Sequence, residues 1–168
     1  MLTTMSDDRS VYLQQLTPSQ CRAHCFLAAL GVLESPAADV WRRAAEAPLV
    51  DLFGPEWELL TLLHDTRAEL SEEATQRLHL CILWRYFRGP GVARFHRPEG
   101  EQRLIGWLAA QLRRPQLGTA AEVEAELAAV YESIWEAIVR RVSLGPAVRE
   151  RALRTRPADA PGPVALVH

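Results

Sequence analysis

Apolar residues recur along this chain at the spacing of a helix that turns one face toward a core. No segment shows sustained alternation of apolar and polar residues between turn signals, which is the pattern of a half-buried strand. The pattern therefore predicts an all-α fold, a single-domain compact bundle of six to eight helices with one long central helix. We expect helices near residues 18–33, 36–47, 55–69, 72–88, 99–113 and 120–144, and short helical pieces near 7–15 and 146–154.

Several of these helices begin at residues that satisfy the first backbone N–H groups of a helix. Thr17 precedes Pro18 and Gln20, a combination that supplies an N-cap, a proline in the first turn and the glutamine of a capping box. Ser35 stands before a proline in the same way, and Ser71 opens a run with two glutamates. These signals predict where the helices start to within a few residues.

Two helices carry most of the expected core. The segment 72–88 is apolar in nearly every direction, which is typical of a buried helix. The helix over 120–144 has an apolar arc wider than one partner helix needs. Either it is the central helix of the bundle, or a second copy of the chain covers part of it in a homodimer.

The chain length of 168 residues fits one domain. We expect residues 1–155 to form that single helical domain. Residues 156–168 contain three prolines and one glycine, so we expect a flexible C-terminal tail there.

The composition points to the genome more than to a binding site. The chain has no lysine and no asparagine, so all 19 basic residues are arginine. Both missing residue types have codons that begin with AA, which a high-GC bacterial genome suppresses. A formal net charge of −2 argues against general attraction to nucleic acid or to a membrane surface. Arginine is therefore informative here only where it clusters.

The expected location is the cytoplasm. The first ten residues lack a cationic start followed by an apolar run, so we expect no secretion signal. No stretch approaches 18 uninterrupted apolar residues, and we therefore expect no membrane partner. Three cysteines, an odd number, do not form a disulfide framework, and we expect them to be reduced.

Cys21, His24 and Cys25 form the densest group of candidate metal ligands or reactive thiols. On a helix the two cysteines lie one turn apart with the histidine at their flank. Thiolate and imidazole suit zinc or iron. However, the spacing matches neither C-x-x-C nor H-x-x-x-H, and buried cysteine often acts as a small apolar residue. We interpret the group as structural and expect no cofactor, with a metal or thiol site as the alternative.

In a helical chain, the adjacent His64 and Asp65 resemble the doublet of the HD phosphohydrolases, and His24 would be the first histidine of that pattern. The resemblance implies a metal held by these residues and a later aspartate. After Asp65 the only aspartate is Asp159, in the proline-rich tail, which offers no rigid element to hold a ligand. We therefore interpret the doublet as a surface pair on an amphipathic helix. The chain also lacks a Walker A loop, a G-x-S-x-G motif and a dinucleotide-binding glycine pattern.

The most unusual segment runs from 85 to 97 and combines arginines, aromatic residues and a Gly-Pro-Gly turn. Arginine planes and aromatic faces suit phosphate, carboxylate or single-stranded nucleic acid. Alternatively, the arginines complement the end of a helix, Gly89 caps it, and the phenylalanines point inward. The candidate ligands for an anion or an acidic partner are Arg85, Arg88, Arg94, His96 and Arg97.

A second basic patch closes the chain and consists of Arg140, Arg141, Arg149, Arg151 and Arg154. Acidic residues gather earlier on the same long helix. This polarity favours antiparallel self-association, but it is also what the helix dipole predicts.

Three functions remain open at this stage. The first is a non-catalytic helical protein–protein interaction module, such as an adaptor, regulator or accessory subunit of a bacterial cytoplasmic system. The second is a nucleic-acid-associated protein that binds through its arginine clusters. The third is a small metal- or thiol-dependent enzyme built on Cys21, His24 and Cys25.

Overall fold

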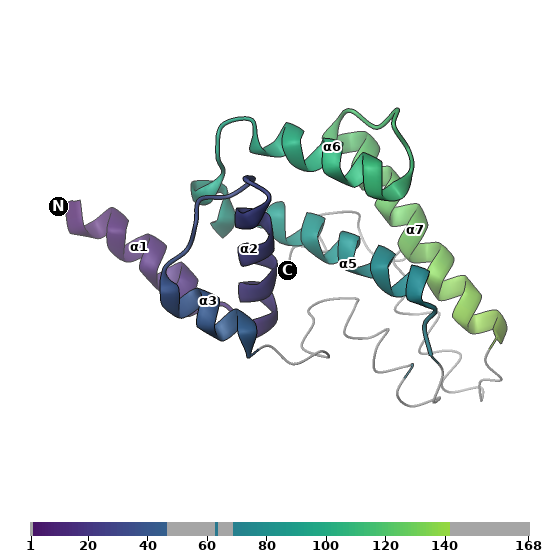
Figure 1. Ribbon diagram of the computed structural model, residues 1–168, viewed down its shortest axis with the longest axis horizontal. Coiled ribbons are helices and arrows are strands. Elements are labelled where there is room, and N and C mark those ends of the chain that lie inside the picture. Colours follow the sequence, from purple (N-terminus) through teal and green to yellow (C-terminus); the bar gives the residue numbers. More distant parts are fainter. Residues whose placement is uncertain (1, 47–62, 64–68, 142–168) are drawn as a thin grey trace.

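The computed structural model describes residues 2–46, 63 and 69–141, and within them every regular element is a helix. The one backbone pairing of β type in this part of the chain is an isolated bridge between Leu33 and His96. The predicted all-α fold is therefore confirmed. The helices are α1 (Leu2–Gln14), α2 (Pro18–Ala29), α3 (Ala38–Ala45), α5 (Glu72–Phe87), α6 (Gly100–Leu112) and α7 (Ala120–Arg141), with a short 3-10 helix, η1 (Gly91–Phe95) (Figure 1).

The capping signals at Thr17 and Ser71 place two helix starts correctly, and a third start is capped at Thr119. The Thr17 hydroxyl accepts a hydrogen bond from the Gln20 amide, and the Gln20 side chain accepts one from the Thr17 amide, which completes the capping box of α2. Ser71 Oγ accepts the Ala74 N–H at the start of α5. Thr119 and Glu122 form the same reciprocal pair at the start of α7. Local hydrogen bonds thus decide where these helices begin.

Some observed helix ends differ from the predicted ones by two or more residues, and the helix expected over 18–33 ends at Ala29. The third helix does not start at Pro36 but at Ala38, and no side chain caps it. The chain before it stays extended because the Glu34 amide donates to the Phe95 carbonyl beside the Leu33–His96 bridge. The short piece near 7–15 is instead the 13-residue helix α1, which projects from the other helices (Figure 1).

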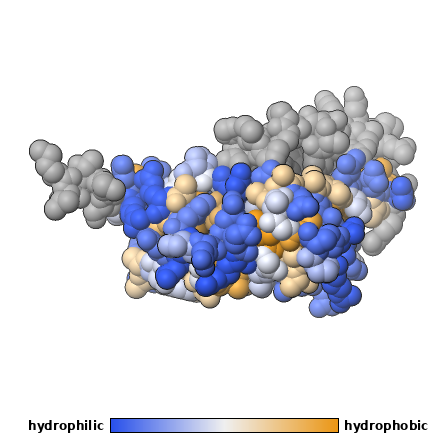
Figure 2. All heavy atoms as spheres, turned by 90° about the horizontal axis from the view of Figure 1, so that it is seen from above, coloured by the Kyte–Doolittle hydropathy of each residue, from blue (hydrophilic) through white to orange (hydrophobic). Residues whose placement is uncertain are grey.

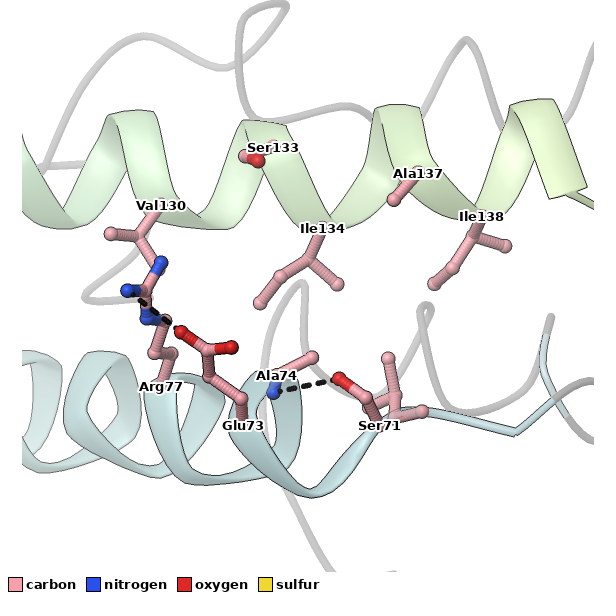
Figure 3. Close-up of a pocket in the computed structure, with 10 residues that line it drawn as sticks. Ser71, Glu73, Ala74, Arg77, Val130, Ser133, Ile134, Ala137 and Ile138 are labelled. Carbon is pink, nitrogen blue, oxygen red and sulfur yellow. Dashed lines mark hydrogen bonds and ion pairs between the residues drawn. The ribbon is translucent and has the colours of Figure 1, made fainter.

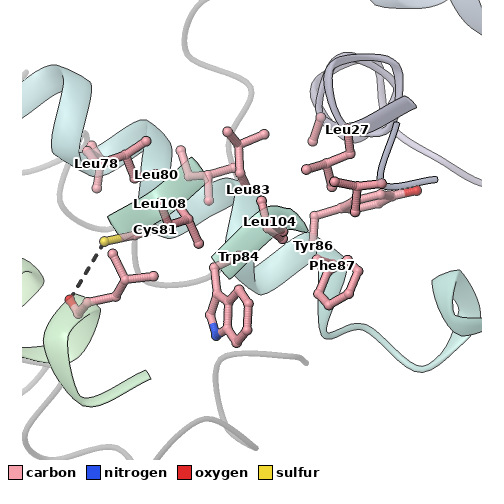
Figure 4. Close-up of a cluster of buried hydrophobic side chains, with 14 of the residues drawn as sticks. Leu27, Leu78, Leu80, Cys81, Leu83, Trp84, Tyr86, Phe87, Leu104 and Leu108 are labelled. Atoms are coloured by element: carbon pink, nitrogen blue, oxygen red, sulfur yellow. Dashed lines mark hydrogen bonds between the residues drawn. The ribbon is translucent and has the colours of Figure 1, made fainter. Parts of the chain in front are cut away.

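Helix α5 is the buried helix that its apolar pattern predicts. It packs against α2 and α7, while Leu104 and Leu108 of α6 also reach its side chains (Figure 4). Its buried apolar residues are Leu78, Leu80, Cys81, Ile82, Leu83, Trp84, Tyr86 and Phe87.

Most of the apolar arc of α7 within the described residues is buried in one chain, although Ala128 is exposed and Val139 is only partly buried. Tyr131 and Trp135 extend the main stripe around the helix, and both are buried. Contacts with α5 and α6 account for part of this burial. The arc therefore does not require a second copy of the chain to cover it.

Some predictions lie outside the described residues. These include the helices expected near 55–69 and 146–154, the His64–Asp65 doublet and the tail 156–168. None of the helices in the described ranges combines the length and the apolar character needed to cross a lipid bilayer.

Candidate functional site

The cationic segment at 85–97 does not present its arginines as one surface. Arg85 is buried, with 6% of its surface exposed, and makes interactions within the protein. Arg88 is the C-cap residue of α5, one position before the glycine expected there, and forms ion pairs with Glu101 at 3.1 Å and Glu124 at 3.3 Å. These two arginines hold α5 to its surroundings.

The histidine of the same segment is also engaged within the protein. The His96 ring stacks on Phe87 with ring centroids 4.1 Å apart, and its Nε2 donates to the Phe87 carbonyl at 3.1 Å. Phe87 and Phe95 point inward and are buried. Arg94 and Arg97 are the exposed arginines of the segment that form no ion pair within the described residues, whereas the exposed Arg88 is paired. A binding role for the segment 85–97 stays a prediction, and it would depend on the side chains of Arg94 and Arg97.

The predicted metal or thiol group is enclosed in the core. Cys21, His24 and Cys25 are all buried on α2. Burial, with a smaller contribution from the nearby Cys21, raises the pKa of the Cys25 thiol to about 11. Burial likewise raises the pKa of Cys21. Across the described ranges, no group of three or more His, Cys, Asp or Glu side chains is arranged to hold a metal ion.

His24 belongs to a buried hydrogen-bond chain that joins three helices. The Tyr12 hydroxyl of α1 donates to the Tyr86 oxygen of α5 at 3.2 Å, and the Tyr86 hydroxyl lies 2.8 Å from His24 Nδ1. With Tyr86 as donor, His24 is neutral and its ring proton is on Nε2. Burial lowers the pKa of His24 to about 4, partly opposed by a hydrogen bond with the Glu34 backbone. This histidine has a structural role in the arrangement observed.

The buried thiols should be nearly inert in the folded protein. We expect an aromatic disulfide reagent to modify the 3 cysteines of the native chain far more slowly than those of the chain in guanidinium. The difference should be roughly a hundredfold or more, because both thiolate formation and access are suppressed. Absorbance of the released thiolate measures both rates. A native thiol that reacts as fast as free cysteine would contradict this account and favour the thiol-enzyme alternative.

The second basic patch falls largely outside the described residues. Arg149, Arg151 and Arg154 lie there, and the side chain of Arg141 is not described either. Arg140 is exposed and lies 3.9 Å from Glu136 on the same helix.

A cleft of about 170 Å³ lies between the start of α5 and the second half of α7 (Figure 3). Ile134 and Ile138 contribute apolar walls. Most of its polar groups are already used, because Ser71 caps α5 and Glu73 pairs with Arg77 at 3.0 Å, which leaves the exposed Ser133 hydroxyl. A small-molecule site needs polar groups free to orient its ligand, so this cleft is a poor candidate.

The feature that sequence reasoning missed is an exposed aromatic pair where α2 meets α6. Phe26 is 42% exposed and packs edge-to-face against the half-buried Trp107, with ring centroids 5.4 Å apart. Arg103, one turn before Trp107, lies with its guanidinium over Gly31, the left-handed residue that ends α2. We call Phe26, Arg103, Gly106 and Trp107 the α2–α6 surface. Figure 2, which views the molecule from the α6 side, shows a few apolar residues near the middle of the view among mostly hydrophilic ones.

Gly106 gives this surface an open notch. It occupies the interior of α6 on the face shared with Arg103 and Trp107, and a Cβ added there would meet nothing within 4 Å. A glycine inside a helix costs roughly 1 kcal/mol relative to alanine, and nothing in the packing of the chain requires one here. A glycine within an otherwise regular helix is the sequence signal that marks this position.

Comparison with protein-family models, curated proteins and solved structures found no match to this chain.

Proposed function

We propose that the protein is a non-catalytic helical protein–protein interaction module, an adaptor, regulator or accessory subunit that binds its partner through the α2–α6 surface. The observation that carries the proposal is the exposed Phe26–Trp107 pair. Phenylalanine and tryptophan rings left in water offer a large apolar area whose burial stabilises a complex. Tryptophan and arginine are also the residue types that dominate binding energy at protein interfaces.

The surroundings of the pair support a docking role. Val11 and Trp41 are also exposed, but among the described residues Trp41 forms no ring contact with another aromatic side chain. Among the aromatic contacts of the described residues, the Phe26–Trp107 pair is the one that includes an exposed ring, and it joins two helices. The neighbouring Gly106 lets a partner backbone approach α6 closely. The surface therefore combines an apolar anchor point with room for a second chain.

Composition supports a bacterial cytoplasmic setting for this proposed module. All three cysteines are buried free thiols, which agrees with a reducing compartment. The absence of lysine and asparagine agrees with a high-GC genome.

The test is a selection of random 12-residue peptides, displayed on phage, against the full chain. Selected peptides are then titrated against Gly106→Gln, which fills the notch without touching the core. We expect this variant to melt at the same or a higher temperature, since glutamine favours the helix more than glycine does. Peptide affinity should nevertheless fall about tenfold or more.

Gly118→Gln is the matched control, because Gly118 is exposed outside the α2–α6 surface and an added Cβ there makes only an ordinary contact with Glu122. It should bind the selected peptides as the unmodified chain does. If no peptide is enriched, or if every enriched peptide binds both variants equally, the α2–α6 surface is not a docking site.

A further inference from the structure

Resting on the proposed function, we infer that the partner presents an acidic segment, with an apolar side chain for the Phe26–Trp107 pair and carboxylates for Arg97 and Arg103. The inference concerns the chemistry of the partner. It starts from Arg97 and Arg103, which both make contacts at the turn around Gly31 that ends α2.

Arg97 and Arg103 meet at the turn that ends α2. The Arg97 amide donates to the Val32 carbonyl at 3.1 Å, and the Arg103 guanidinium lies over the adjacent Gly31. Arg103 is also one helical turn from Trp107, on the same face of α6. The Arg103 guanidinium is therefore placed on the side of the aromatic pair where α2 ends, and the backbone of Arg97 is held at the same turn.

Both arginines are exposed, and neither takes part in an ion pair within the described residues. Glu99 accepts the Arg103 amide through its backbone carbonyl and forms no ion pair with either side chain, and Glu101 pairs with Arg88 instead. The guanidinium groups can thus each offer a fork of N–H donors to an incoming carboxylate.

Several other arginines pair with glutamates of the same chain, whereas Arg42, Arg94 and Arg113 are exposed and have no ion pair within the described residues. The ion pairs in the described ranges are Arg9–Glu34, Arg77–Glu73, Arg88–Glu101, Arg88–Glu124, Arg114–Glu126 and Arg140–Glu136. Of the exposed arginines without an ion pair in the described ranges, Arg103 is the one that shares a face of α6 with Trp107. A single strand of nucleic acid instead needs a basic groove that follows its backbone over several nucleotides. A short acidic peptide fits a local pair of cations better.

The experiment uses the 12-residue peptides selected on the full chain and a charge-reversed variant, Arg97→Glu/Arg103→Glu. We expect the peptides to be enriched in Asp and Glu around a Leu, Phe or Trp. Their affinity should fall about tenfold in the variant at ~0.1 M salt and less at 1 M, where exposed charges are screened. Arg42→Glu, a charge reversal at an exposed position on α3, is the matched control for the single variant Arg97→Glu and should bind normally.

Arg103 lies against the end of α2, so reversing the charge of its side chain can disturb folding. The single variant Arg97→Glu is therefore measured as well, and it should weaken peptide binding about threefold. If the selected peptides are neutral or basic, and their affinity depends on Gly106 but not on these arginines, the inference of an acidic partner is wrong. The proposal that the α2–α6 surface is a docking site would still hold. Tight binding of fluorescein-labelled dT20 that the charge reversal abolishes would overturn it in favour of single-stranded nucleic acid. A dimer in sedimentation that Gly106→Gln dissociates would overturn it in favour of a second copy.

Discussion

Replacing Phe87 by alanine is expected to lower the free energy of unfolding by about 3–5 kcal/mol. Phe87 is fully buried at the end of α5, where its ring stacks on His96 and contacts Trp84 with ring centroids 5.7 Å apart. Truncation leaves a cavity between rigid neighbours and removes the surface that orients His96. Urea denaturation followed by circular dichroism measures the change.

Phe26→Ala makes the same chemical change at the exposed ring of the α2–α6 surface. It should cost about 1 kcal/mol or less in stability, since much of the ring is already in water. The pair of variants thus separates a phenylalanine that holds the fold from one that we assign to binding. Equal losses in both variants would show that Phe26 also supports the fold and would remove the main support for the proposed function.

Acidification is expected to destabilise the fold through His24. Its pKa lies near 6.5 in the unfolded chain and at about 4 in the folded one, because the folded protein buries the ring in neutral form. Between these values the unfolded state binds more protons, so stability falls as the pH falls through that window. The contribution of this one group is about 3 kcal/mol.

His24→Gln isolates that contribution, because glutamine does not titrate and retains an acceptor for the Tyr86 hydroxyl. Carboxylates that titrate in the same range affect both proteins equally. We expect the stability of the unmodified chain to fall more steeply between pH 6.5 and pH 4 than that of the variant. Urea titrations at each pH give the two stability curves. If the curves of the unmodified chain and the variant run parallel, the pKa of His24 is the same in the folded and unfolded states, which contradicts the expected burial of a neutral ring.

The parts of the fold that could be predicted from the sequence are those set by interactions between residues close together in the chain. The capping boxes at Thr17 and Thr119 and the apolar surface of α5 each arise within one helix, so a local pattern contains them. The start of α3 was missed because a distant partner, Phe95, holds residue Glu34 extended. Local propensity at Ser35 and Pro36 cannot report that contact.

The candidate site also combines features that the local sequence shows with features that only packing decides. Arginine clusters are visible in the sequence, but whether an arginine faces water or a glutamate depends on packing, as the ion pairs of Arg88 show. The Phe26–Trp107 contact joins residues far apart in the chain, and no periodicity predicts it. Gly106 inside a regular helix was the one local sign of an unusual surface.

Amide hydrogen exchange of the full chain, with and without the tightest selected peptide, tests the docking surface most directly. The account predicts that the peptide slows exchange most in residues 103–110 of α6 and 26–33 at the end of α2, while residues 130–140 of α7 are unchanged. A footprint centred on α7 or on the α5–α7 cleft, with α6 unaffected, would contradict it.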